Sequence, residues 1–185
     1  ARTKSGAIAH LLAAAPGNEA LRRDLVLTWT LAGQEAVETE EHGTAGLDLR
    51  IAAAAEASAA GMRTAIRFDP VIPSYFDPGE YRGLIERLWS SGARPERFEV
   101  GALRFPPGLW ELVRGRHRDS RLLRGEYFTD SEGKRRSYRP ERIRMYRAIV
   151  SSIREIFPRS QIELSMEDME VWEDSGLEPP AGRPD

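Results

Sequence analysis

The sequence predicts an α/β protein built as part of a (β/α) barrel, and three observations lead to this fold class. Four β-rich runs alternate with helical runs along the chain. The ends of the three later β-rich runs carry arginine or carboxylate side chains. Because parallel strands joined by helices bring their C-terminal ends to one edge of a sheet, these side chains are expected to converge on one mouth.

The length and composition of the chain favour a single globular domain. The chain has 185 residues, of which 41% are hydrophobic and 30% are charged. No apolar run approaches the roughly 20 residues of a membrane span, so we expect no membrane contact and a cytoplasmic location. The chain contains no cysteine. This excludes disulfides, thiolate nucleophiles and cysteine-ligated zinc or iron–sulfur centres within these residues, and no metal site is predicted.

The first third of the chain reads as helix, strand, loop and helix. Residues 6–15 favour a short helix with Ser5 as its N-cap, and no strand is seen before it. Residues 24–31 are rich in β-branched and aromatic side chains, which is typical of a strand. An acidic loop over 32–46 and an alanine-rich helix over 47–60 follow. With the next strand, these residues form a right-handed βαβ unit over 24–68.

The second strand ends in a polar pair. Arg67 and Asp69 lie two residues apart and therefore on one face of the strand. Pro70 and Pro73 are expected to end it, since proline cannot donate a ladder hydrogen bond in a central strand. The pair would form an interior ion pair that positions a substrate, or one that serves architecture alone.

The remaining elements are predicted from the same periodicities. Helical spacing is found over 81–89, over 109–113 and, most clearly, over 140–157. Strands are expected over 97–105, over 126–129 before a turn at 130–133, and over 161–167. We predict that residues 1–173 form the barrel part and that residues 174–185, which are rich in proline, form a disordered tail.

Two groups of functional residues are predicted from the residues alone. Polar side chains at strand ends are hard to explain by core packing. The predicted catalytic residues are Arg67, Asp69, Arg104, Glu163 and Glu167. The region 114–147 is rich in arginine with interleaved aromatic residues, which suits a phosphate backbone and stacking bases, although a solvated face explains most charge runs. The predicted nucleic-acid contacts are Arg135, Arg136, Tyr138 and Arg139.

Several short motifs, in a consistent order over residues 2–172, resemble spore photoproduct lyase and its relatives. The motifs are Thr3-Lys4-Ser5, Leu27-Thr28-Trp29-Thr30-Leu31, Glu41-His42-Gly43-Thr44, Arg67-Phe68-Asp69-Pro70, Gly101-Ala102-Leu103-Arg104-Phe105, Arg135-Arg136-Ser137-Tyr138-Arg139 and Ile162-Glu163-Leu164-Ser165-Met166-Glu167. This family belongs to the radical S-adenosylmethionine enzymes, which use a partial (β/α) barrel and a [4Fe–4S] cluster to release a 5′-deoxyadenosyl radical. Spore photoproduct lyase uses that radical to reverse a thymine dimer in DNA.

The resemblance implies a set of cofactor contacts. Lys4 and Ser5 would contact S-adenosylmethionine, with the lysine ammonium facing the methionyl carboxylate. Thr30 replaces a serine near the nucleoside and would bond a ribose oxygen. Glu41 and Arg50 would flank the cofactor or pair with each other structurally. The resemblance also implies DNA as a partner.

The sequence departs from the family in its lack of cysteine. The family's CxxxCxxC cluster loop and its hydrogen-donor cysteine are both missing, and Ser165 stands where some relatives carry cysteine. We therefore expect the C-terminal half of a radical S-adenosylmethionine barrel whose N-terminal strands and cluster loop are missing, so that these residues are inert without the cysteine-bearing half or a partner chain. The alternative is a non-catalytic nucleotide or nucleic-acid binding module that has lost the cluster. A metal-independent hydrolase is weaker, because no nucleophile and base stand out.

Overall fold

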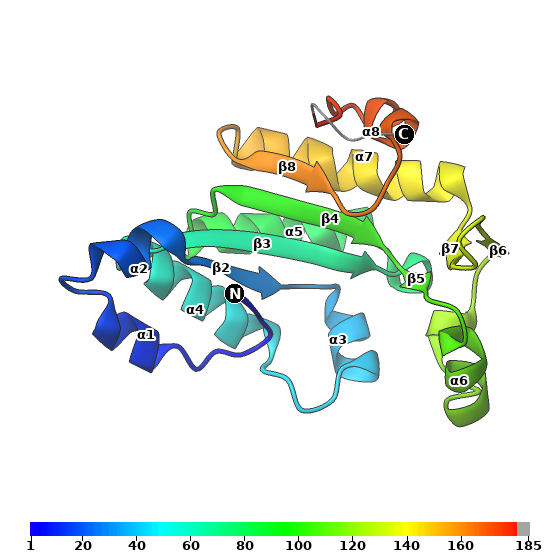
Figure 1. Ribbon diagram of the computed structural model, residues 1–185, viewed down its shortest axis with the longest axis horizontal. Helices are drawn as coiled ribbons and strands as arrows, with labels where there is room; N and C mark the ends of the chain where they lie inside the picture. Colours follow the sequence, from blue (N-terminus) through cyan, green and yellow to red (C-terminus); the bar gives the residue numbers. More distant parts are fainter. Residues whose placement is uncertain (181–185) are drawn as a thin grey trace.

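A parallel sheet is the centre of the molecule, as the computed structural model of residues 1–180 shows (Figure 1). It has five strands in the order β1-β2-β3-β4-β8, and every neighbouring pair is parallel. The strands are β1 (Arg2–Thr3), β2 (Val26–Thr30), β3 (Arg63–Val71), β4 (Arg97–Ala102) and β8 (Gln161–Leu164). The predicted α/β fold class, a partial barrel, is confirmed.

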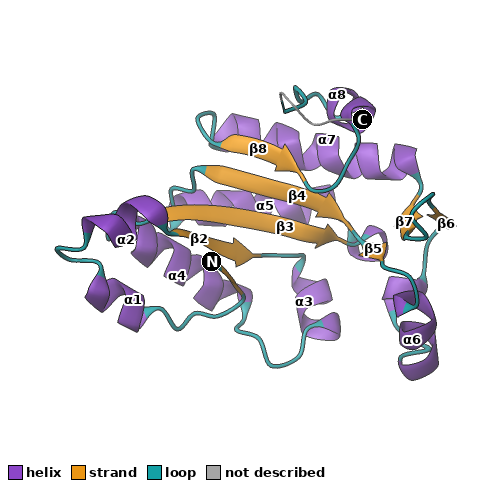
Figure 2. Ribbon diagram, in the orientation of Figure 1, coloured by secondary structure: helices purple, strands orange, loops and turns teal. Residues whose placement is uncertain are grey.

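Three long helices cover one face of this sheet and lie behind it in the view of Figure 2. They are α4 (Leu47–Ala59), α5 (Pro78–Ser90) and α7 (Arg139–Ile156). The shorter helices are α1 (Ala9–Ala14), α2 (Glu19–Asp24), α3 (Gln34–Glu40), α6 (Leu109–Arg116) and α8 (Met169–Asp174), with 3-10 turns η1 (Pro73–Tyr75) and η2 (Arg121–Leu123). Each of the predicted helices 47–60, 81–89, 109–113 and 140–157 is found, with small differences at its ends.

The alternation of the strands separates an apolar face from a polar one. Phe68 and Phe98 are fully buried on the helical side, where Phe68 meets Tyr81 of α5 edge to face. On the opposite side, the register places Arg67 beside Glu99 and Glu99 beside Glu163. Since residues in register on neighbouring strands point to the same face, a polar row crosses the sheet. We call this side the polar face.

A small antiparallel sheet extends from the C-terminal edge of the large one. Its strands are β5 (Arg104–Phe105), β6 (Tyr127–Thr129) and β7 (Arg135–Ser137), in the order β5-β7-β6. The predicted strand over 126–129 is confirmed as β6. The prediction of one continuous strand over 97–105 is wrong, because Arg104 and Phe105 leave β4 and pair with β7 instead.

The N-terminal prediction needs correction. A strand does precede the first helix, since β1 pairs with β2. Helix α1 begins only after Ile8, and Ser5 does not cap it, because the Ser5 hydroxyl accepts a hydrogen bond from the Ala7 N–H at 3.0 Å. Helix α2, capped by Asn18, delays the first long strand to Val26. Helix α3 also occupies part of the region predicted as a loop.

Strand β3 continues two residues beyond its predicted end at Asp69 and includes Pro70. Its pairing with β4 shifts register between Phe68 and Val71. Proline is tolerated at such an irregularity because no ladder bond is required from its nitrogen. The prediction that Pro70 ends the strand is therefore wrong.

The C-terminal region is more regular than predicted. Strand β8 ends at Leu164, so Glu167 lies beyond the strand that we predicted over 161–167. Asp174 ends α8, and Ser175 and Leu177 are buried, so the boundary of the predicted tail at 174 differs from that of the structure. Residues 181–185 of that tail lie outside the described residues. Among residues 1–180, no helix has the length and apolar character needed to cross a membrane.

Candidate functional site

One carboxylate at the C-terminal edge of the sheet is held by two arginines. Asp69 accepts a hydrogen bond from Arg67 of its own strand and another from Arg104 of β5, at 3.2 Å. Arg67 Nε also lies 3.2 Å from Glu99 Oε1. The Asp69 side chain is 7% exposed, whereas those of Arg67 and Arg104 are 17% and 19% exposed. The three predicted residues therefore meet at the expected edge, with the guanidinium groups accessible from the polar face.

The backbone beneath this cluster has room for no side chain. A Cβ on Gly101 would lie 2.8 Å from Asp69 Cγ and 2.8 Å from Ser165 Cβ. Arg104 also reaches Ser165, whose hydroxyl lies 3.4 Å from its Nη2. Gly101 thus lets the ends of β3, β4 and β8 approach one another closely.

The two other predicted catalytic carboxylates do not join this cluster. Glu163 lies on the polar face with its side chain 45% exposed, and its carboxylate is 3.7 Å from Arg97. Glu167 is only 3% exposed and receives two hydrogen bonds from Arg142, at 3.0 and 3.1 Å. Glu167 therefore belongs to a buried network, while Glu163 faces solvent on the polar face.

Tyr146 connects the buried network to the end of β4. Its hydroxyl donates to Glu167 at 2.6 Å and accepts from the Ala102 N–H at 2.8 Å. Burial raises the pKa of Tyr146 well above its ordinary value, and the Glu167 charge raises it further. Tyr146 therefore stays protonated as a donor, and the network stabilises the strand that carries Gly101.

A second cluster surrounds Glu41 at the end of α3. Glu41 accepts from Lys4 at 2.6 Å and from Arg50 at 2.6 Å. The fully buried Arg50 also donates to the Thr30 and Ala45 carbonyls, at 2.9 and 2.7 Å. Burial by itself would raise the pKa of Glu41, but the hydrogen bonds from Arg50 and Lys4 outweigh it and hold the pKa below its usual range.

Four of the five predicted cofactor residues therefore share one network. Lys4, Glu41 and Arg50 take part through their side chains, whereas Thr30 contributes its carbonyl. Ser5 adjoins this network along the chain, and its carbonyl accepts from Trp29 Nε1 at 3.1 Å. Structural pairing of Glu41 with Arg50, one of the two predicted roles, is thus observed.

The predicted nucleic-acid residues lie on and beside β7, and their arginines are engaged with carboxylates. Arg135 contacts Glu111 at 3.3 Å, Arg136 donates to Asp130 at 2.9 Å, and Arg139 donates to Glu170 and Asp174, at 2.7 and 2.8 Å. Tyr138 is 56% exposed. Arg136 also donates to the Met166 carbonyl at 2.9 Å, which ties β7 to the turn after β8.

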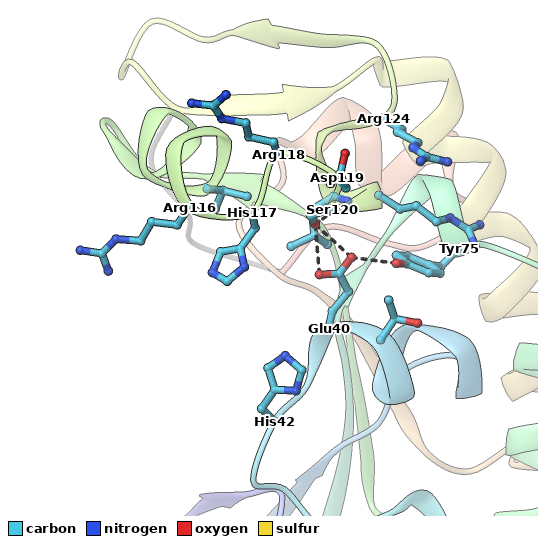
Figure 3. A pocket seen from close by; sticks show the side chains of 13 residues that line it. Glu40, His42, Tyr75, Arg116, His117, Arg118, Asp119, Ser120 and Arg124 are labelled. Atoms are coloured by element: carbon cyan, nitrogen blue, oxygen red, sulfur yellow. Dashed lines mark hydrogen bonds between the residues drawn. The ribbon is translucent and has the colours of Figure 1, made fainter.

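Sequence reasoning missed a pocket beside the mouth. Glu40 at the end of α3 accepts hydrogen bonds from Tyr75 at 2.7 Å and from Ser120 at 3.0 Å, and the three residues line a pocket of about 640 Å³ (Figure 3). The acidic loop and the histidines were visible in the sequence. Their partners lie far along the chain, so no spacing pattern indicated the pocket.

Comparison with known proteins places this geometry in a defined class of fold. No protein-family description and no curated protein sequence matches the chain. Among solved structures, a cysteine-to-alanine variant of spore photoproduct lyase is similar, with a TM-score of 0.74 and 20% identity, over 89% of this chain and 50% of that chain. A variant with bound AdoMet and dinucleoside spore photoproduct has a TM-score of 0.69 and 20% identity, over 87% of this chain and 49% of that chain. A complex of the lyase with dinucleoside spore photoproduct has a TM-score of 0.68 and 20% identity, over 89% of this chain and 50% of that chain.

The fold and the charged edge of the sheet define this chain as a partial (β/α) barrel. The particular fold is that of spore photoproduct lyase, and the coverage fits the predicted C-terminal half. The chain spans about half the length of the solved structures that it matches.

Proposed function

We propose that this chain is the C-terminal portion of a radical S-adenosylmethionine enzyme that repairs a thymine-dimer DNA lesion or performs related radical chemistry. The observation that carries the proposal is the convergence of Arg67, Asp69 and Arg104 at the ligand-handling edge of a sheet with this fold. A solved structure of this fold holds AdoMet together with a dinucleoside lesion, which supports the same two ligand classes.

The donor set of this chain fits S-adenosylmethionine. The Lys4 ammonium carries three N–H donors, one of which is used by Glu41, and its side chain is 36% exposed. Lys4 would hold the methionyl carboxylate, Ser5 and Thr30 would hold polar atoms of the cofactor, and Glu41 and Arg50 would fix the position of Lys4. When bound, this cofactor supplies the precursor of a carbon radical.

An iron–sulfur cluster does not fit the residues of this chain. Its usual ligands are cysteine thiolates, and the sequence has none. We therefore assign no step to a cluster here, and we propose that these residues are inert without a cysteine-bearing part or partner.

The charged residues at the mouth would position the substrate. Arg67 and Arg104 share Asp69 and are partly exposed, so their remaining N–H groups can donate to carbonyl or phosphate oxygens of a nucleic-acid lesion. Glu163 would accept a hydrogen bond on the polar face. Glu167 would act through Tyr146, which holds the end of β4. Preorganised donors of this kind need no rearrangement during the reaction.

The proposal is tested by binding of S-adenosylmethionine to the protein isolated from its source, measured by calorimetry. Lys4→Ala should weaken binding about tenfold or more, because it removes the ammonium group that pairs with the methionyl carboxylate of the cofactor. Lys134→Ala is the matched control, since Lys134 is the other lysine of the chain and lies in the turn between β6 and β7. Equal affinities of the two variants would contradict the assigned cofactor contact.

The chemistry is tested separately by anaerobic reconstitution with iron and sulfide, after the intact mass of the natural gene product has been measured. A product larger than these 185 residues that gains cluster absorbance would support the radical enzyme. The lack of cysteine favours one alternative, a non-catalytic nucleotide or nucleic-acid binding module. Oligonucleotide binding by a product of only these residues, without cluster or turnover, would establish that alternative.

A further inference from the structure

The Glu40 pocket is the cavity between α3, η1 and the segment 116–124 that Figure 3 displays. Its volume of about 640 Å³ lies in the range of small-molecule sites. The lining residues do not include Arg67, Asp69 or Arg104, so the pocket is separate from the mouth. An inference about it does not depend on the proposed radical chemistry.

The floor of the pocket is a carboxylate with acceptor capacity to spare. Glu40 receives hydrogen bonds from the hydroxyls of Tyr75 and Ser120. Burial, together with the bond to Glu40, raises the pKa of Tyr75 to about 12, so this hydroxyl keeps its proton. Ser120 lies within 3.1 Å of both carboxylate oxygens but has one proton to donate. Two donors serve about four acceptor positions, which favours a ligand that brings N–H groups.

The rim of the pocket carries arginines that the fold does not use. Among residues 1–180, the side chains of Arg116, Arg118 and Arg124 make no ion pair, and Figure 3 shows them spread around the opening rather than converging. Arg121 differs, because it bonds Glu35 and the Ser74 carbonyl and lies 4.1 Å from the centre of the Tyr75 ring. These three arginines outnumber Asp119, the carboxylate beside them, so the rim is positively charged. Because the arginines are spread apart, they suit several successive phosphates better than a single phosphate.

Two histidines flank the opening. His42 follows α3, and His117 follows α6, and their rings face the same gap from opposite sides in Figure 3. Imidazole rings can stack on a base and donate hydrogen bonds to it. The pocket therefore combines flat side walls, an accepting floor and a cationic rim.

We propose that the Glu40 pocket binds one nucleotide of a single nucleic-acid strand. The base lies between His42 and His117, its amino group donates to Glu40, and the neighbouring phosphates lie on the arginines of the rim. A carboxylate pairs with the exocyclic amino group of cytosine, whereas thymine has no such group. The pocket therefore prefers cytosine to thymine.

The test is fluorescence anisotropy with oligo(dC) and oligo(dT) of equal length. The protein should bind oligo(dC) about tenfold more tightly, and Glu40→Gln should remove most of that preference. His117→Ala, at an exposed position, provides a second test. It should weaken the binding of both oligonucleotides about tenfold, because the stacking contact is lost. Equal binding of the two oligonucleotides by the unmodified protein would overturn the base contact.

The rim is tested by replacing Arg116, Arg118 and Arg124 with alanine. This variant should bind both strands at least tenfold more weakly, and the slope of log affinity against log salt should fall by about two. The control replaces Arg154, in the last turn of α7, and Arg159, just after that helix, with alanine and should change neither quantity. If only Arg135→Ala and Arg139→Ala weaken oligonucleotide binding, the nucleic-acid strand lies along β7, and the proposed rim contacts are overturned. If dCMP binds as tightly as oligo(dC), the ligand is a free nucleotide, and the strand is excluded.

Discussion

Arg104 donates a hydrogen bond to Asp69 at 3.2 Å, although the two residues lie in different sheets. Arg67 donates to the same carboxylate oxygen. One buried carboxylate therefore connects the parallel sheet to the small antiparallel sheet, and two partly exposed guanidinium groups share its charge.

Replacing this carboxylate should destabilise the protein. Asp69→Asn leaves Arg104 without its anionic partner and leaves Arg67 with Glu99 alone, and we expect a loss of about 1.5–3 kcal/mol in the free energy of unfolding. Urea titration followed by tryptophan fluorescence measures this loss. The double variant Arg67→Asp, Asp69→Arg restores opposite charges and should be more stable than either single exchange, yet inactive when the cysteine-bearing part is present. Activity in that variant would exclude the mouth as the site.

A methyl group at position 101 should also destabilise the sheet edge. Gly101→Ala places a carbon 2.8 Å from Asp69 and from Ser165, so strands β3 and β8 must move apart. Overpacking of this kind costs about 1–3 kcal/mol. Thermal unfolding should show a lower midpoint, whereas Gly83→Ala, which meets no atom within 4 Å, should not destabilise the protein. Equal midpoints for the two variants would contradict the close packing.

The Glu41 cluster should make stability depend on acid. Since the folded-state pKa of Glu41 is lowered, its contribution is fully present above the unfolded-state value of about 4.3 and is lost as the pH falls through the folded-state pKa. Glu41→Gln should therefore lower stability at pH 7, and the difference from the unmodified protein should shrink below pH 4.3. Urea titrations at several pH values measure it. A difference that stays constant down to pH 2 would mean that the charge of Glu41 is not involved.

Loss of one hydroxyl should weaken the buried network behind the mouth. Tyr146→Phe removes a donor to Glu167 and the acceptor of the Ala102 N–H, and leaving buried polar groups unpaired costs about 1–3 kcal/mol. Tyr138→Phe is the control, because that side chain is 56% exposed. Chemical denaturation should separate the two variants, and a Tyr146→Phe protein as stable as the control would refute the role of this hydroxyl.

Local patterns in the sequence were enough for the fold class and for the polar pair of β3. Two-residue alternation assigns Arg67 and Asp69 to one face, and helical spacing marks α7, because both signals lie within a few consecutive residues. These local patterns did not predict the short elements. Helix α3 buries only Ala36 and Val37, and β1 has two residues, so neither contains a full period.

Tertiary structure alone decided which charges meet. Glu163 and Glu167 looked equivalent on one predicted strand, but β8 ends between them, and only Glu167 turns into the core toward Arg142. The partners Glu40 and Ser120 are 80 positions apart, and Lys4 meets Glu41 across 37. A charge pattern shows where arginines and carboxylates are present. Strand register and the path of the connecting segments determine which of them come within hydrogen-bonding distance, because such bonds act over about 3 Å.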